Sequence, residues 1–327
     1  MGDPAGVGPE VCLHLLAHPE ITQECVPVIF GDASIMQRVA RVTGLPLHAQ
    51  IVNHEEWKTQ QLKLDEPTIL DLGLLNAEDV SPGVLGAHTG TAAYTYVNAA
   101  IDAALAGEVV AVSTAPLNKE AMSMAGIHFP GHTEIFASRT NASRSCMMQY
   151  SEEITCTFVT VHVGYREVPD VMTTARILDV IELSGEALRG IRGHDPKIVV
   201  LGLNPHAGEH GLFGDREEER IIMPAIEAAR AKGWQVEGPI PPDTAFLPWK
   251  RKSTDVFVCM YHDQGHIPVK ALAFDCAVNT TLGLPIIRTS VDHGTAYDIA
   301  WQNKANPGSL FHAVRLALKL AKAKAIL

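Results

Sequence analysis

The sequence lacks the motifs that mark the common nucleotide-binding and hydrolase folds. Nowhere in its 327 residues does G-x-G-x-x-G follow a strand pattern, and neither a Walker loop nor a G-x-S-x-G elbow is present. These absences exclude the usual dinucleotide-binding, NTPase and α/β-hydrolase folds. No apolar run is long enough to cross a bilayer, and the start, MGDPAGVGPEV, has neither a basic segment nor an apolar signal core. We therefore expect no membrane partner.

Positive charge is also scarce, and cysteines show no pairing pattern. The formal net charge is −11, whereas a nucleic-acid backbone requires a basic face, so we expect no nucleic-acid partner. The six cysteines are scattered without a C-x-x-C pair. Several lie in apolar runs, such as Cys259 in VFVCM, and we interpret them as buried thiols of a reduced, cytoplasmic protein.

Short apolar runs alternate with longer amphipathic stretches along the chain. Strand-like runs cover residues 26–31, 67–72, 108–116, 153–162, 197–203 and 255–259, and helical patterns cover 33–43, 90–107, 174–191, 215–233 and the chain from 308. This alternation predicts α/β layers with a largely parallel sheet. The length and the 46% of hydrophobic residues fit two domains, joined by crossing segments, with a cleft between them.

Three predicted strands are each followed by a histidine. FVTVH ends in His162, VLGLNPH in His206 and VCMYH in His262. In open α/β sheets, ligands bind beyond the carboxyl ends of strands. Imidazoles on separate rigid strands can hold one divalent cation and leave a position open for substrate. The pattern favours a catalytic metal site over three unrelated histidines. Imidazole suits zinc, cobalt, nickel or iron, whereas magnesium prefers oxygen ligands.

Cationic and polar residues follow the third histidine. Lys270, Asn279 and Arg288 each lie beside an apolar stretch, where an unpaired charge is costly. A phosphate or carboxylate ligand would offset that cost. Ion pairs to nearby acids, such as Asp275 or Asp292, are an equally good explanation from sequence.

Further candidates lie in two Pro- and Gly-containing segments. In FPGHTEIFA (129–137), His132 and Thr133 begin a predicted helix whose free N–H groups attract anions, although a plain Thr cap is the alternative. Lys119 in STAPLNKEA is a weaker anion-site candidate of the same kind. Asp243 in IPPDTAF is a candidate carboxylate for the metal or for proton transfer, with a turn or cap residue as the alternative.

An ordered set of motifs covers nearly the whole chain: GDPAGVGPE, STAPLNKEA, GHTE, GLNPHAGE, PPDTAF, MYHDQG and VNTTLGLPIIRTSVDHGTA. Taken together and in this order, the motifs resemble the 4-hydroxythreonine-4-phosphate dehydrogenase family of pyridoxal phosphate biosynthesis, including the related D-threonate and D-erythronate 4-phosphate dehydrogenases. The resemblance implies two α/β/α domains with an interdomain cleft, as in isocitrate and isopropylmalate dehydrogenases. We expect residues 1–127 plus 284–327 to form the first domain and 128–283 to form the second.

The resemblance also implies roles for individual residues. A divalent metal, zinc, magnesium or cobalt, is expected on His162, His206 and His262. Substrate ligands are expected to be His132, Thr133, Lys270, Asn279 and Arg288. The cofactor, NAD or NADP, is expected near His293, Gly294 and Asn306, although Trp301–Lys304 replace a Gly-rich stretch of the relatives. Asp243 and Lys270 are the catalytic candidates, with a metal-bound water as an alternative base.

The implied reaction is a metal-dependent oxidation of the 3-hydroxyl of 4-(phosphooxy)-L-threonine by NAD or NADP. Decarboxylation of the β-keto acid would then yield 3-amino-2-oxopropyl phosphate. The same reaction on D-threonate or D-erythronate 4-phosphate is an alternative, because HDQGHIPVK and GTAYDIA look closer to those relatives. A phosphate acyltransferase is the alternative of another class, and the three histidines argue against it. The resemblance further implies a homodimer with shared active sites, and a strand preceding the turn GDPAGVGPE is expected but not seen in the sequence.

Overall fold

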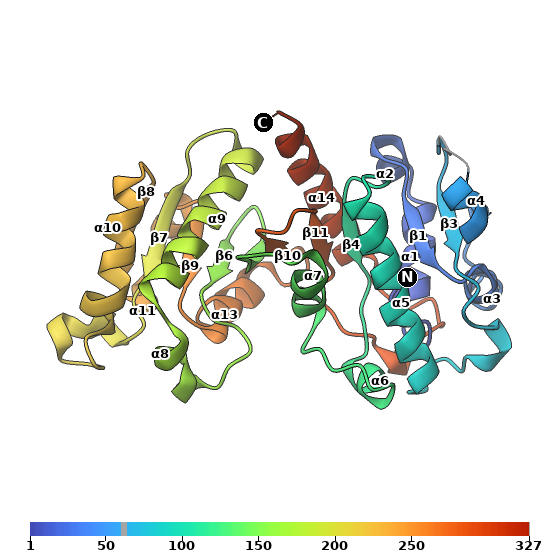
Figure 1. The fold of residues 1–327 in the computed structure, drawn as a ribbon, viewed down its shortest axis with the longest axis horizontal. Coiled ribbons are helices and arrows are strands. Elements are labelled where there is room, and N and C mark those ends of the chain that lie inside the picture. The colour runs from blue at the N-terminus through green and yellow to red at the C-terminus, as the bar shows by residue number, and fades with distance from the viewer. Residues whose placement is uncertain (60–63, 327) are drawn as a thin grey trace. The chain divides into compact units, whose positions relative to one another are not determined.

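The computed structural model describes residues 1–59 and 64–326 and shows a mixed α/β chain, as the sequence predicts (Figure 1). Its contacts form two compact units. The first unit contains Met1–Thr140 and Arg288–Ala317, and the second contains Asn141–Ile287 and the chain from Leu318 on. From the sequence, we expect the domain limits after residue 127 and before residue 284. These limits stay a prediction, whereas the two units have their own bounds.

The first unit contains a parallel sheet with strand order β1-β3-β2 and a separate parallel pairing of β4 with β11. Its strands are β1 (Val28–Gly31), β2 (Gln50–Asn53), β3 (Thr68–Asp71), β4 (Val112–Thr114) and β11 (Arg288–Ser290). Its helices are α1 (Gly8–Leu16), α2 (Pro19–Glu24), α3 (Ala33–Thr43), α4 (His54–Thr59), η1 (Ala77–Asp79), α5 (Ala87–Leu105), α6 (Lys119–Met124), α7 (His132–Thr140), η5 (Tyr297–Ile299) and the start of α14 (Gly308–Ile326).

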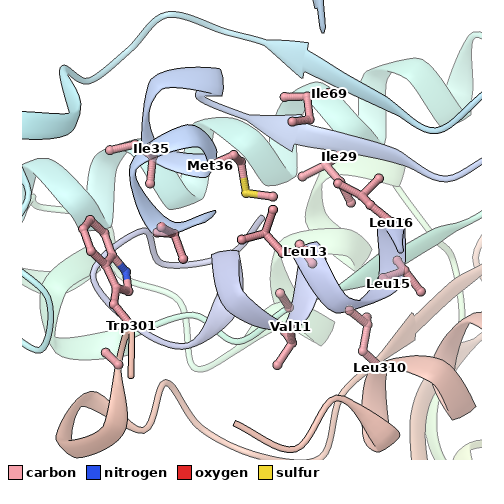
Figure 2. Packing of buried hydrophobic residues seen from close by; sticks show 14 of the residues in the cluster. Val11, Leu13, Leu15, Leu16, Ile29, Ile35, Met36, Ile69, Trp301 and Leu310 are labelled. Atoms are coloured by element: carbon pink, nitrogen blue, oxygen red, sulfur yellow. The ribbon is translucent and has the colours of Figure 1, made fainter. Parts of the chain in front are cut away.

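The core of the first unit lies around α1, which is buried along almost its whole length. Figure 2 shows Leu13 of α1 facing Met36 of α3 and Ile29 of β1, with Trp301 at the edge of the same cluster. The Trp301 indole N–H donates to the carbonyl oxygen of Pro4 at 3.1 Å, and the guanidinium of Arg38 lies 5.1 Å from its ring centroid. The Trp301 side chain is therefore buried in this core.

The second unit is built on strands in the order β10-β5-β6-β9-β7-β8. The pairings of β6 with β9, β9 with β7 and β7 with β8 are parallel, and β5 runs antiparallel to both β10 and β6. The strands are β5 (Cys146–Tyr150), β6 (Thr155–Phe158), β7 (Lys197–Leu201), β8 (Gln235–Ile240), β9 (Val256–Cys259) and β10 (Val278–Leu282). The helices are η2 (Tyr165–Glu167), α8 (Val168–Val171), α9 (Thr174–Arg192), η3 (Pro205–Gly211), η4 (Glu218–Ile222), α10 (Met223–Ala231), α11 (Pro242–Ala245), α12 (Pro248–Lys252) and α13 (His262–Ala273).

Helices α9 and α13 cover opposite faces of this sheet. The hydroxyls of Thr157 on β6 and Ser184 on α9 are 2.8 Å apart, whereas the next residue of the strand, Phe158, stacks on His266 of α13. Because successive side chains of a strand point to opposite faces, the two helices sit on different sides. The second unit is thus a three-layer α/β/α arrangement with His262 on the α13 side.

The structure corrects several local predictions. The strand predicted over 153–162 ends at Phe158, so His162 follows the strand instead of closing it. The strand predicted over 255–259 is followed by a helix from His262 to Ala273 that the sequence patterns do not predict, because a buried face outweighs the helix-breaking tendency of Gly265 and Pro268. The sequence patterns predict no strand at β2, β5, β8, β10 or β11, and most of these strands contain several polar residues. In VNTTL of β10, for example, hydrophilic side chains lie in the sheet.

Candidate active site

Helix α13 begins three residues after the end of strand β9 and carries four ionisable side chains, His262, Asp263, His266 and Lys270. A Cβ at Gly265 would lie 2.6 Å from a ring carbon of Phe158 and 2.8 Å from Cys259 Sγ, which is too close for any side chain. The glycine therefore lets the first turn of α13 rest directly on β6 and β9. That close packing sets the positions of His262 and His266.

The two imidazoles of α13 form a parallel stack. Their ring centroids are 3.8 Å apart with an interplanar angle of 9°, and His266 also stacks on Phe158 at 4.4 Å. His266 Nδ1 lies 2.9 Å from the carbonyl oxygen of His262, and its Nε2 lies 3.3 Å from Nε2 of Gln149. Since a carbonyl only accepts, Nδ1 carries the proton and Nε2 accepts from the amide. Burial lowers the pKa of His266 to about 4, so the ring is neutral at pH 7.

His262 is also held through its own Nδ1, which lies 2.7 Å from Oδ1 of Asp263. The other carboxylate oxygen, Oδ2, accepts a hydrogen bond from the hydroxyl of Tyr165. The hydrogen bond from Tyr165, followed by that from His262, lowers the pKa of Asp263. His162 is exposed, and its ring centroid is 6.1 Å from that of His262.

His206 lies on a strained loop, η3. Residues 206–210 all have φ between 42° and 79°, and each residue other than glycine costs roughly 1–2 kcal/mol in this left-handed conformation. Such strain persists only where neighbouring interactions enforce it, and it is frequent at functional sites. The loop presents His206 at an exposed position, with the Phe213 ring centroid 6.1 Å away.

Two buried carboxylates hold the start of this loop. Glu218 Oε1 accepts from the backbone N–H groups of Leu203 and Asn204 at 2.9 and 2.8 Å, and the Asn204 amide donates to both Glu217 and Glu218. A Cβ at Gly208 would lie 2.6 Å from Glu218 Oε2. Glu217 and Glu218, which precede helix α10, therefore accept hydrogen bonds from the start of the loop that carries His206 and hold it in place.

The donor set on this side of the second unit fits a divalent cation. A zinc–nitrogen bond of about 2.0–2.1 Å places an imidazole centroid roughly 3.2 Å from the ion, so the 6.1 Å between His162 and His262 is compatible with a shared ion. Because Asp263 fixes the proton of His262 on Nδ1, Nε2 retains its lone pair. Within residues 1–59 and 64–326, however, no group of three or more His, Cys, Asp or Glu side chains already has metal-binding geometry. The joint role of His206 with the other two stays a prediction.

The remaining candidates of the second unit lie on nearby elements. Asp243 is exposed on α11, which contacts the His206 loop η3. Lys270 is exposed on α13, two turns beyond His262. Asn279 on β10 is half-buried and pairs in register with Gln149, the partner of His266.

The first unit contains a cavity of about 210 Å³ that joins residues predicted for substrate and for cofactor. Its lining includes Lys119 at the start of α6, His132 at the start of α7, and the adjacent His293 and Gly294. The Nε2 atoms of both histidines are buried and have no hydrogen-bond partner in the described part of the chain. His293 Nδ1 lies 2.9 Å from the Gly294 carbonyl oxygen and so carries the proton, which leaves Nε2 as an acceptor. A polar ligand that donates hydrogen bonds and carries negative charge suits this cavity.

Arg288 lies close to this cavity in sequence and structure, on β11. Only 2% of its surface is exposed, its Nη2 donates to the Thr114 hydroxyl at 3.3 Å, and it lies 5.5 Å from the Phe136 ring centroid. Burial lowers its pKa to about 9. Thr133 follows His132 on α7, and Asn306 accepts from the Gly308 backbone at 2.9 Å at the start of α14. Asn306 is not among the residues lining the cavity.

His132 is held in its neutral form. The residue as a whole is half-buried, but its Nε2 is fully covered. Burial lowers the pKa of His132 well below its usual range, and the positive charges of Arg288 and Lys119 lower it further. At neutral pH it is therefore a hydrogen-bonding group and not a cation.

Comparison with known proteins defines the class of enzyme. A D-threonate 4-phosphate dehydrogenase of Pectobacterium atrosepticum is 42% identical over 332 residues, covering 98% of this chain and 98% of that protein. A 4-hydroxythreonine-4-phosphate dehydrogenase of Desulforapulum autotrophicum is 42% identical, covering 97% and 93%. The crystal structure of a 4-hydroxythreonine-4-phosphate dehydrogenase from Klebsiella pneumoniae matches with a TM-score of 0.84 at 42% identity, over 98% of both chains. The chain is a dehydrogenase, an oxidoreductase that acts on a CH–OH group.

The family follows from the match over most of the sequence. Residues 23–317 match the family described as pyridoxal phosphate biosynthetic protein PdxA, and the chain belongs to this family. The resemblance inferred from the motifs is thereby confirmed, and a dehydrogenase is favoured over the acyltransferase alternative. None of the helices in the described part of the chain has the length and apolar character needed to span a bilayer.

Some residues of the site have no signal in the sequence. Tyr165 lies in VGYREV, an unremarkable exposed segment, and Gln149 lies inside an apolar strand. Both act through partners more than 90 residues away in the chain. Their contribution depends on pairing that only the tertiary structure creates. Asp263 does have a weak signal in the sequence, because a carboxylate directly beside a candidate metal histidine can hydrogen-bond to it.

We expect Glu218→Gln to destabilise the protein by about 1–3 kcal/mol. The new amide nitrogen would face a donor, either the Asn204 side chain or the backbone N–H groups that Glu218 now accepts. Urea denaturation would measure the free energy of unfolding. Glu227→Gln, an exposed change on the adjoining helix α10, should leave it unchanged. Equal stabilities of the two variants would show that Glu218 does not hold the loop.

We expect His132 to make the stability depend on pH below about 6.5. The unfolded chain gains a proton there, at the ordinary histidine pKa, whereas native His132 stays neutral, so the free energy of unfolding falls by at most about 1.4 kcal/mol per pH unit. His132→Gln should lose stability less steeply between pH 7 and 5, and the exposed neighbour variant His128→Gln should keep the wild-type slope. Identical slopes for His132→Gln and wild type would contradict the neutral assignment.

Proposed function

We propose that the chain oxidises the 3-hydroxyl of 4-(phosphooxy)-L-threonine with NAD or NADP and releases CO₂ to give 3-amino-2-oxopropyl phosphate. Support comes from membership of the family and from relatives that bear this enzyme name. The structural observation that carries the proposal is the approach of His162 and His262 to 6.1 Å, with a carboxylate already fixing the second ring.

The proposal assigns the following roles. His162, His206 and His262 hold a divalent cation, of which zinc, cobalt or magnesium are candidates. Such a cation, when bound, lowers the pKa of the substrate hydroxyl and stabilises charge on its oxygen. Asp243 would take the hydroxyl proton as general base. The nicotinamide cofactor, when bound, would supply the oxidant that accepts the hydride of C3. Cleavage of the bond between C2 and the carboxylate carbon of the β-keto acid would release CO₂, and C2 would then take up a proton from water to give the product.

Orientation of the substrate is assigned to the cationic and polar residues. Lys270, Asn279 and Arg288 hold the phosphate and carboxylate, which fixes C3 relative to the hydride acceptor. Neutral His132 and Thr133 donate or accept hydrogen bonds without repelling a cation. The cavity lined by His293 and Gly294 supports a cofactor position in the first unit; Asn306 is proposed for the same role on family resemblance alone.

A second substrate has comparable support. A relative named D-threonate 4-phosphate dehydrogenase is as similar, at 42% identity over the full length, as those named for 4-hydroxythreonine 4-phosphate. D-Threonate 4-phosphate and D-erythronate 4-phosphate carry a 2-hydroxyl where the first substrate carries a 2-amino group. Steady-state kcat/KM for the three acids, each with NAD and with NADP, decides among them. A rate that is negligible with all three would overturn the proposed function.

A homodimer is part of the proposal. Ile267 on α13 and the C-cap residue Phe274 are seven residues apart and hence on one side of the helix. They are 65% and 64% exposed, and Leu272 is 38% exposed. Exposed apolar side chains clustered beside a site are typical of an interface. We further propose that the enzyme acts in the cytoplasm, which is supported by the six cysteines, all of which are free thiols.

We expect His206→Ala to lose most of its bound divalent metal and nearly all turnover while it remains folded. His210→Ala is the matched control, because His210 is exposed in the same loop and shares its left-handed backbone. Metal analysis of the purified proteins and circular dichroism check the two statements. Full metal occupancy in His206→Ala would remove this residue from the ligand set.

We expect the active sites to be shared between two subunits. Light scattering should give twice the 35.3 kDa chain mass, and Ile267→Asp should shift the protein towards monomer, whereas Val110→Asp, a change at a residue that is 74% exposed, should not. In a shared site, Lys270 of one subunit would act together with His206 of the other subunit. A heterodimer of inactive His206→Ala and inactive Lys270→Ala would then have one site with both changes and one site with neither, so part of the activity should return. Heterodimers that form without regaining activity would assign each site to a single subunit.

A further inference from the structure

His262 is constrained on two sides before any ligand is present. Its Nδ1 faces Asp263 Oδ1 at 2.7 Å, and one ring face is covered by His266 at 3.8 Å and 9°. An ionised carboxylate can only accept, so the Nδ1 of His262 must be the donor. In the neutral ring the lone pair is then on Nε2, the nitrogen left for a ligand.

Asp263 is in turn fixed by a residue from a different segment. Its Oδ2 accepts from the Tyr165 hydroxyl, and the Tyr165 ring meets Tyr261 edge-on at 5.8 Å and 86°. Tyr165 lies three residues after His162, on η2. The hydrogen bond therefore ties the segment that carries His162 to the helix turn that carries His262.

The stacked neighbour contributes by being neutral. His266 is 6% exposed, donates to the His262 carbonyl oxygen and accepts from Gln149. A ring that donates through one nitrogen and accepts through the other carries a single proton and is uncharged. A neutral ring can support His262 from behind without repelling a cation bound in front, which a protonated ring would do.

We propose that Tyr165 and Asp263 are positioning residues that, with the stacked His266, preset His262 in its Nδ1-protonated form as a metal ligand and link it to His162. This role rests on the proposed metal-dependent function. A carboxylate that accepts from a metal-bound histidine fixes its tautomer and raises its basicity, and loss of such a partner typically lowers metal affinity by roughly 10–100-fold. Tyr165 acts one step further out, through Asp263.

The test measures cation affinity and the tautomer separately from turnover. Purified full-length variants are freed of metal and titrated with Zn²⁺ or Co²⁺ against a chromophoric chelator. Asp263→Ala should weaken binding by about 10–100-fold, Tyr165→Phe by about two- to tenfold, and Asp263→Asn, which keeps an accepting oxygen, by an intermediate factor. Tyr261→Phe removes a hydroxyl outside this series of hydrogen bonds and should bind as wild type does.

The second measurement uses the metal-free protein. Nitrogen-15 chemical shifts of the imidazoles should show His262 protonated on Nδ1 in the wild type, with this preference lost in Asp263→Ala. Unchanged cation affinity in Asp263→Ala, or an Nε2-protonated His262 in the wild type, overturns the positioning role. Wild-type protein that binds neither Zn²⁺ nor Co²⁺ stoichiometrically overturns the proposed metal dependence itself, and this role with it.

Discussion

The close approach of helix α13 to strands β6 and β9 is the constraint on which the candidate site depends. Gly265 makes it possible, because a Cβ there would lie 2.6 Å from Phe158. The helix starts one residue after the N-cap Tyr261, so its first turn is fixed by the end of β9. The short connection therefore fixes the positions of His262, Asp263 and His266, which a longer connection would leave less well defined. Precision in such a site comes from rigid elements and not from the loops alone.

The loop η3, which carries His206, has a strained backbone and is held by side-chain hydrogen bonds instead of by a regular helix. Loop η3 is strained, with left-handed backbone at His206 and its neighbours, and its conformation is enforced by Glu217 and Glu218 through side-chain and backbone hydrogen bonds. Buried carboxylates are costly unless they are fully bonded. Here they are bonded to the loop itself, so the cost of burying them and the strain of the backbone are offset by the same contacts.

The first unit contributes a cavity that is lined by Lys119 and two histidines among apolar residues. His132 is kept neutral by burial and by the cations around it, and His293 presents an acceptor beside it. Trp301 packs into the hydrophobic core around α1 (Figure 2). The cavity therefore keeps its lining of Lys119, His132 and His293 without interference from that indole.

The sequence alone determined the α/β class, most long helices and the candidate histidines, because apolar periodicity and residue chemistry are local properties. Helices such as α3 and α9 follow it closely, and the ordered motifs identified the family. Only the tertiary structure decided that residues 262–273 form a helix, that polar segments such as β10 enter a sheet, and that Tyr165, Gln149 and Glu218 contact the histidine segments. These outcomes depend on contacts between residues far apart in the chain. A glycine that permits close packing or a glutamate that turns back onto a loop looks, in sequence, like an ordinary turn or helix residue.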